Sequence, residues 1–220
     1  MNFIKGTIRA SPFVGVFACL TDKTLFVPHS VQDKEIKDIE GKLDVAVVKC
    51  SLANSTLIGV LGKAIGNRIA VPEIADAREI RDMERNGVEV LKVGGVMALG
   101  NLVALNGKAG IASPLLREKQ VRELQDFFGV KIKQERVSGS DLVGAAVVVT
   151  NKGFIVHQSI TETEHKSLEK LFKVRGIPTT AKYGDRFIGN DVVANSSGAI
   201  VGDMTTPFEM MRIDEALTGD

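Results

Sequence analysis

Short apolar runs recur along the chain at nearly equal spacing. Each run follows a small turn and ends near one residue: TLFVPH at Pro28, RIAVPE at Pro72, GIASPL at Pro114, GFIVHQ at His157 and GAIVGD at Asp203. The intervals between these residues are 44, 42, 43 and 46 positions. Self-similarity at a fixed period of this length is typical of proteins built from repeated structural units. The pattern therefore predicts five units of about 44 residues.

A segment with helical periodicity follows each of these runs. Apolar residues recur three or four positions apart, which places them on one helix face; they are Ile36 and Ile39, Ile80 and Met83, Val121, Leu124 and Phe128, Leu168, Leu171 and Phe172, and Met210, Ile213 and Leu217. Capping boxes are predicted at the helix starts: Thr161 with Glu164, Thr206 with Glu209 and, more weakly, Ser30 with Asp33 and Asp76 with Glu79. Glycine ends helices readily because it enters the left-handed region without a steric penalty. The expected end points are Gly41, Gly87, Gly129, Gly176 and Gly219.

The remaining apolar segments have the composition of β-strands. One set follows the helices: LDVAVVKC, VEVLKV, VKIKQERV and IPTTAKY. Another set begins after small polar residues: STLIGVL, GNLVALN, DLVGAAVVVT and NDVVAN. Each unit therefore reads strand, turn, strand, helix, strand, which is a ββαβ-type repeat.

The fifth unit lacks its last strand, because the chain stops directly behind the fifth predicted helix. At the other end, residues 2–10 read as a strand. If this strand completes the fifth unit, the five units close into a ring and no sheet edge stays exposed. We therefore expect an α/β fold with fivefold pseudosymmetry, a single domain over residues 1–220, closed by its N-terminal strand.

Composition and charge exclude several classes of protein. Of the 220 residues, 44% are hydrophobic, and 28 basic residues nearly balance 27 acidic ones. A protein that binds nucleic acid mainly through its phosphates carries a larger basic surplus. No apolar stretch is long enough to cross a membrane, the N-terminus does not read as a signal peptide, and two cysteines make no disulfide framework. We expect a cytoplasmic monomer, because a self-closed ring needs no partner chain.

Residues suited to catalysis or metal binding are sparse. The three histidines, His29, His157 and His165, show no metal-ligand spacing, and the glycine-rich turns lack phosphate-loop spacing. We therefore expect no metal and no cofactor. Cys19 lies inside an apolar run and is expected to pack as a small hydrophobe. Cys50 ends a strand, and Cys50 with His29 or His157 is the combination to check for nucleophilic catalysis.

Four segments carry a resemblance to a known family: SLANSTLIGVL, AIGNRIAVP, MALGNLVAL and NKGFIVH. Together with the five-unit ring they resemble the translation initiation factor six family of archaea and eukaryotes, and the end of the chain behind the fifth helix resembles the archaeal members. The resemblance covers the whole chain and implies a pentein-like αβ propeller. It also implies a non-enzymatic role. Members bind the intersubunit face of the large ribosomal subunit, at a ribosomal protein beside the sarcin–ricin loop, block the small subunit and accompany large-subunit maturation.

The resemblance also implies where the chain makes contact. The family's contact surface resembles the loops that join the last strand of each unit to the next unit, here residues 11–15, 50–59, 94–101, 137–141 and 183–190. Asn101 matches the asparagine of the family's ALGN motif and is the first candidate. The other candidates are Gly100, Leu99, Gly59, Gly15, Phe13, Asp185 and Arg186. Phe13 and Phe187 would serve as apolar anchors if exposed, with Asp185 and Arg186 at the charged rim.

Two other functions stay open at this point. The same fivefold architecture also carries guanidino-group hydrolases and amidinotransferases, so a cysteine-dependent enzyme is the main alternative. Its signature would be a cysteine, a histidine and a carboxylate meeting in one axial pocket. A ring that binds RNA by itself would need a basic stripe, for which Lys92, Lys131, Lys133 and Arg136 are the candidates.

Overall fold

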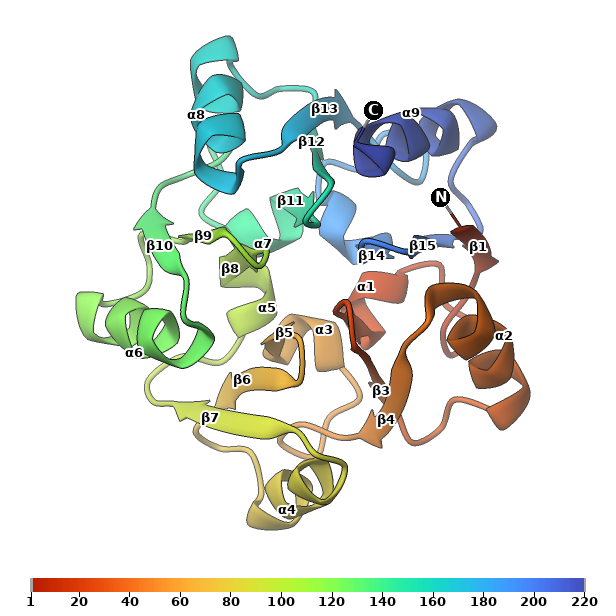
Figure 1. The fold of residues 1–220 in the computed structure, drawn as a ribbon, viewed down its shortest axis with the longest axis vertical. Helices are drawn as coiled ribbons and strands as arrows, with labels where there is room; N and C mark the ends of the chain where they lie inside the picture. Colours follow the sequence, from red (N-terminus) through yellow and green to blue (C-terminus); the bar gives the residue numbers. More distant parts are fainter. Residues whose placement is uncertain (1, 220) are drawn as a thin grey trace.

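Five small sheets surround a central axis. The structure is a computed structural model that describes residues 2–219, apart from the side chains at positions 35, 37 and 38. Within this part of the chain every sheet has three strands, and Figure 1 shows the five units following one another around the axis in chain order. The α/β ring with fivefold pseudosymmetry that the sequence predicts is confirmed.

All five sheets share one topology: an inner strand runs antiparallel to a middle strand, and the middle strand runs parallel to an outer one. The inner strands are β2 (Cys19–Leu20), β5 (Lys63–Ile65), β8 (Val103–Leu105), β11 (Val147–Val149) and β14 (Val192–Ala194). The middle strands are β3 (Thr24–Pro28), β6 (Arg68–Pro72), β9 (Ala109–Ala112), β12 (Gly153–His157) and β15 (Gly198–Gly202). The outer strands are β4 (Ala46–Cys50), β7 (Glu89–Val93), β10 (Lys131–Gln134), β13 (Arg175–Thr179) and β1 (Asn2–Gly6).

The N-terminal strand closes the ring. β1 pairs in parallel with β15, from Asn2 beside Gly198 to Gly6 beside Gly202. It therefore supplies the outer strand that the fifth unit lacks, as the sequence predicts. Because this pairing joins the two ends of the chain, the fifth sheet has no missing edge.

The long helices cover the outside of the ring (Figure 1). They are α2 (Asp33–Leu43), α4 (Ala77–Arg85), α6 (Glu118–Phe128), α8 (Glu162–Phe172) and α9 (Pro207–Thr218). Each packs its predicted apolar face into a cluster that also holds residues of the preceding unit: Met83 of α4 shares a cluster with Phe26 of β3. A single repeat cannot bury such a face alone, so the core lies between units as much as within them. None of the described helices has the length and apolar character needed to cross a membrane.

Most predicted helix starts are confirmed. Asp76, Thr161 and Thr206 each form the expected capping box with the residue three positions later. The prediction at Ser30 is wrong, because α2 starts at Asp33 with Gln32 as its N-cap and no side-chain capping bond.

Two of the five predicted helix stops are wrong. Gly87, Gly129 and Gly219 follow their helices with φ of +75°, +69° and +81°. Gly41, however, lies inside α2, and Gly176 lies in β13. A Cβ at position 176 would lie only 2.1 Å from the ring of Phe154, so that glycine is required by close packing and not by a helix end.

A short helix, which the sequence does not predict, precedes each inner strand. The segments expected to start as strands begin with one helical turn: α1 (Val14–Phe17), α3 (Ile58–Leu61), α5 (Leu99–Leu102), α7 (Val143–Ala146) and the 3₁₀ turn η1 (Ile188–Asn190). Each contacts the next, and η1 contacts α1, so they form a second closed ring nearer the axis (Figure 1).

Five glycines allow this inner ring to close: Gly15, Gly59, Gly100, Gly144 and Gly189. A Cβ on Gly100 would lie 1.7 Å from the carbonyl oxygen of Gly59, and one on Gly59 would lie 1.9 Å from that of Gly15. The remaining ring glycines contact their neighbours in the same order around the axis. Since real side chains never approach backbone so closely, only glycine fits at the positions whose Cβ would collide in this way.

A candidate binding face

The two ends of the ring differ in construction. Hairpin turns join inner and middle strands at one end, which we name the turn face (residues 21–23, 66–67, 106–108, 150–152 and 195–197). Because the outer strands run parallel to the middle ones, each long helix must start at the opposite end, where the outer strand also leaves its sheet. We name that end the loop face. It consists of residues 7–13, 51–57, 94–98, 135–142 and 180–187 and of the turns before the long helices, residues 29–32, 73–76, 113–117, 158–161 and 203–206.

Exposed apolar side chains gather on the loop face. The described residues include eight exposed large hydrophobic side chains, and six of them belong to loop-face segments: Leu57, Ile74, Met97, Leu115, Tyr183 and Met204, with exposed fractions from 37% to 75%. The other two, Phe208 and Met211, lie in the first turns of α9, the former at its second residue. None of the eight lies in the turn face. A concentration of exposed apolar groups on one side of a protein marks a surface that meets a partner.

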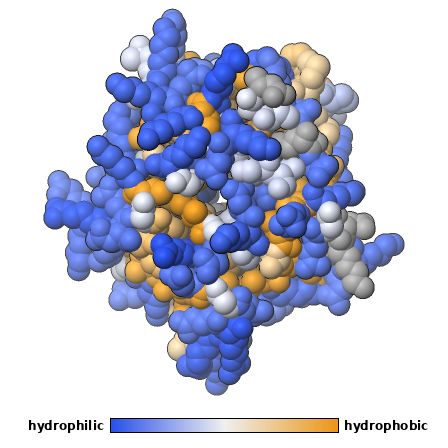
Figure 2. Space-filling model, in the orientation of Figure 1, coloured by the Kyte–Doolittle hydropathy of each residue, from blue (hydrophilic) through white to orange (hydrophobic). Residues whose placement is uncertain are grey.

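Apolar residues also surround the axis in fivefold register. The residue before each short helix is Phe13, Leu57, Ala98, Leu142 or Phe187, and all five share nearly the same backbone conformation, with φ from −80° to −100° and ψ from 56° to 66°. Figure 2 views the ring from the turn face, where the two ends of the chain lie: its outer edge is hydrophilic, and hydrophobic positions surround a central hollow.

Arginines supply charge on the same face. Arg9 donates to the Oγ1 of Thr56 at 2.6 Å, and Arg186 donates to the carbonyl of Ser138 at 3.4 Å, so each bridges two neighbouring units. Arg136 pairs with Asp141 at 2.8 Å within one loop. Exposed arginines held beside apolar groups are characteristic of binding surfaces.

A lysine ammonium also lies over an aromatic ring on the loop face. The ammonium of Lys182 is 3.9 Å from the ring centroid of Phe13 and 3.2 Å from the carboxylate of Asp185. These contacts hold the loop of the fifth unit against the first unit.

Carboxylates at the helix starts hold the loops in place. Burial opposes ionisation of Glu79, but hydrogen bonds from Ser51 and from the backbone of Asn54, Asp76 and Ala53 outweigh it and hold its pKa below the ordinary value. The same side chain completes the capping box of α4, so one residue orders a helix start and a loop.

Glu209 repeats this arrangement in the fifth unit. Burial again raises the pKa of Glu209, and bonds from the backbone of Thr206, the side chains of Thr180 and Thr206 and the backbone of Gly184 lower it further than burial raises it. The loop face is therefore ordered before any partner arrives.

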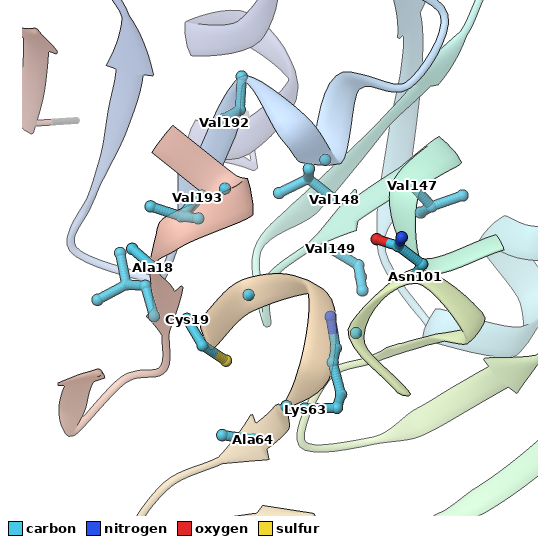
Figure 3. A pocket seen from close by; sticks show the side chains of 18 of the residues that line it. Ala18, Cys19, Lys63, Ala64, Asn101, Val147, Val148, Val149, Val192 and Val193 are labelled. Atoms are coloured by element: carbon cyan, nitrogen blue, oxygen red, sulfur yellow. The ribbon is translucent and has the colours of Figure 1, made fainter. Parts of the chain in front are cut away.

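The residues expected as contacts occupy different depths. Phe13 and Asp185 are partly buried and Arg186 is exposed, all three on the loop face. Leu99 is fully buried, and Gly15 and Gly100 are buried within the short helices. Gly59 and Asn101 are partly buried and line a cavity on the axis, which Asn101 enters with its amide (Figure 3).

The buried candidates, Leu99, Gly15 and Gly100, thus support the loop face from within the ring. Contact of Asn101 with a partner stays a prediction. The sequence did not predict five of the exposed apolar residues on the loop face as contacts: Leu57, Ile74, Met97, Leu115 and Met204. An apolar side chain inside a predicted turn is a signal that could have identified them.

The cysteines do not form the axial constellation that the enzyme alternative requires. Cys19 lines the axial cavity, yet the residues that line this cavity include no histidine, aspartate or glutamate, and burial raises the pKa of its thiol. Cys50 lies away from the axis, in a pocket of about 240 Å³ shared with His29 and Glu79. It is 3% exposed, and burial, with Cys19 and Glu79 adding to the effect, raises its pKa to about 12. Such a thiol is a poor nucleophile.

The histidines make local contacts. His157 shares a 2.8 Å hydrogen bond with Ser159, and burial, helped by Arg186 and opposed by Asp185, lowers its pKa. His165 is half-buried against Phe154 and shares a hydrogen bond with the carbonyl of Gly176. Among the described residues no three His, Cys, Asp or Glu side chains meet closely enough to hold a metal ion.

The proposed basic stripe is partly neutralised. Lys133 pairs with Glu135 at 2.6 Å and Arg136 with Asp141, whereas Lys131 and Lys92 are exposed on the outer strands of different sheets. The loop-face guanidinium groups of Arg9 and Arg186, whose hydrogen bonds go to a hydroxyl and a carbonyl oxygen, therefore offer a better surface for polyanions than this stripe does.

The chain is similar to known proteins in sequence. Residues 3–216 match the model of the eIF-6 family. A protein named translation initiation factor 6 from Pyrococcus abyssi is 36% identical over 214 residues, which cover 94% of each chain. One with the same name from Methanobrevibacter smithii is 39% identical over 209 residues, 94% of this chain and 93% of the relative. Among solved structures, dimethylarginine dimethylaminohydrolase matches with a TM-score of 0.48 and 15% identity, over 93% of this chain and 73% of that one.

Proposed function

Because this chain belongs to the eIF-6 family and is therefore a translation factor, we propose that its loop face binds the large ribosomal subunit and keeps the small subunit from joining. The observation that carries the proposal is the one-sided distribution of exposed apolar groups: six of eight lie in loop-face segments and none in the turn face. A blocker must cover a surface firmly, and it needs no reacting group.

The chemistry of the loop face suits a partner that contains both protein and RNA. Its apolar positions, Leu57 and Met97 nearest the axis, would meet a ribosomal protein on the intersubunit side. The exposed guanidinium groups of Arg9 and Arg186 would meet ribosomal RNA beside that protein, such as the sarcin–ricin loop. Since the ring and its loops are already ordered, binding would cost little conformational entropy.

Co-sedimentation with separated ribosomal subunits tests the location of the face. We expect the protein to travel with large subunits, and we expect Leu57→Glu with Met97→Glu to raise its Kd at least tenfold, which is about 1.4 kcal/mol. Ser197→Glu introduces a glutamate on the turn face and should leave binding unchanged. Equal binding by both variants would show that the loop face is not the contact.

Subunit joining is a separate measurement. Light scattering of mixed subunits should fall when stoichiometric protein is added to large subunits beforehand, and the Leu57/Met97 double variant should restore joining. If the protein binds large subunits and joining proceeds unchanged, the role as a steric blocker is refuted while the binding face stands. We extend the proposal to large-subunit maturation, where depletion of the protein should leave large-subunit precursors unprocessed.

A further inference from the structure

A small cavity lies on the axis, enclosed by the short helices and inner strands. Its volume is about 70 Å³, which suffices for a few water molecules or one small ion with water. Its lining consists largely of glycines, alanines and valines. A neighbouring cavity of about 50 Å³ toward the turn face shares five of these residues: Leu20, Ala64, Leu105, Val149 and Ala194.

One charged residue lines this cavity. Lys63, at the start of β5, is the sole Asp, Glu, Lys, Arg or His among its lining residues. It stands four positions after the ring glycine Gly59, and the residues at that position in the other units are Cys19, Ala104, Val148 and Val193. Fivefold pseudosymmetry therefore places a single ammonium in a layer that is otherwise free of charge.

The ammonium of Lys63 has no carboxylate partner among the described residues. The ion pairs of this part of the chain involve other lysines and arginines. Burial lowers the pKa of Lys63, opposed by the nearby Cys19 alone. A lysine side chain in such surroundings is stable only if it loses its proton and becomes neutral, or if a counter-ion binds beside the ammonium.

The surroundings favour the counter-ion. Figure 3 shows the amine of Lys63 and the amide of Asn101 pointing into the same space, from β5 and α5. The ammonium offers three donors and the amide two more, and the thiol of Cys19 adds a weak one. Several donors around a confined space, with no carboxylate among the lining residues, form a site for a negative ion.

We propose that Lys63 and Asn101 bind a small monovalent anion, of the size of a halide or formate, in the axial cavity. The proposal does not rest on ribosome binding by the loop face, because the observations that carry it concern the axial cavity and Lys63. The anion would neutralise a charge at the point where all five units meet, so its binding would stabilise the closed ring.

Thermal unfolding of the full chain tests the site in solution. Bromide replaces a bulky organic sulfonate at constant ionic strength and pH 7, so that only the size of the anion changes. The Tm of the natural protein should rise with bromide, and above the Kd it should rise with the logarithm of the bromide concentration, as binding to the folded chain alone requires. The Tm of Lys63→Met should not respond. Lys63→Met should fold, since the equivalent residues in other units are uncharged. Lys152→Met removes an exposed lysine of the turn face and should keep the full response.

Crystals grown in bromide locate the ion. We expect an anomalous peak within hydrogen-bonding distance of Lys63 Nζ. We also expect Asn101→Leu to raise several-fold the bromide concentration that produces a given rise in Tm. Equal responses of the natural protein and Lys63→Met would overturn the proposal, as would a Tm of the natural protein that does not change with bromide. A bromide peak in the crystal without a response in solution would also refute it, because it would show binding at soaking concentration alone.

Discussion

Asp191 is a buried carboxyl group whose ionisation works against the fold. It follows η1, its side chain is fully buried, and neither carboxylate oxygen has a hydrogen-bond partner among the described residues. Its pKa is raised from 3.8 to about 7, chiefly by burial and also by Asp185 and Glu209, while Lys182 offsets part of the effect. We expect Asp191→Asn to stabilise the protein at neutral and higher pH.

The magnitude follows from the two pKa values. Below pH 3.8 the carboxyl group is protonated in both the unfolded and the folded chain, so ionisation costs nothing. Between pH 3.8 and about 7 the unfolded chain releases the proton while the folded chain keeps it, so the free energy of unfolding falls as pH rises. Each pH unit of this interval is worth about 1.4 kcal/mol, which gives a loss of about 4 kcal/mol above pH 7.

Urea unfolding of the natural protein and of Asp191→Asn from pH 4 to pH 8 measures this directly. The difference in unfolding free energy should be smallest at pH 4 and grow by up to about 4 kcal/mol by pH 8. For a chain of this size, each 1 kcal/mol corresponds to a rise of about 2–4 °C in Tm. Asp203→Asn, at an exposed aspartate after β15, serves as the control and should show no such growth. A difference that is constant across this pH range would refute the reasoning.

Three further predictions concern the ring and its loops. Deleting residues 1–9 removes β1 from its pairing with β15 and should lower the Tm by many degrees in a thermal melt; an unchanged Tm would show that closure is unimportant. Gly100→Ala places a Cβ against the backbone of Gly59 and should cost about 1–3 kcal/mol in chemical denaturation, whereas Gly41→Ala, with open space around its Cβ, should be neutral or stabilising; equal effects would contradict the close approach. Glu209→Gln should destabilise the protein at pH 7, and this loss should shrink in urea titrations as pH falls below 4.5, because hydrogen bonds lower the pKa of Glu209 in the fold; a loss independent of pH would exclude the charge as the cause.

The repeating pattern of the sequence determined the architecture. Five apolar runs at nearly equal intervals, amphipathic helices between them and a missing last strand were enough to place the N-terminal strand in the fifth sheet, since an open edge is costly. The capping boxes at Asp76, Thr161 and Thr206 could be predicted from the sequence, because each depends on two residues only three positions apart.

Local signals failed where the reason for a residue lies elsewhere in the chain. Gly176 resembles a helix stop, but it is required by the ring of Phe154 on the neighbouring strand. The short helices span only three or four residues, too few to show a helical period, and each contains a glycine that disfavours a helix in isolation. Their conformation is imposed by contacts with the next unit.

The functional surfaces were decided by the tertiary structure. Leu57, Met97 and Met204 are far apart in the sequence, and they share one face because every unit turns its loops toward the same end of the ring. Nothing in the sequence distinguishes Lys63 from the other lysines. Its site is decided by the tertiary structure, because the inner strands converge on the axis and line the cavity around Lys63 with uncharged residues. Sequence periodicity therefore specified the units and their order, because the periodicity reflects which apolar side chains are buried when the chain folds. The positions of exposed and trapped groups followed from the closure of the ring, which no local stretch of sequence encodes.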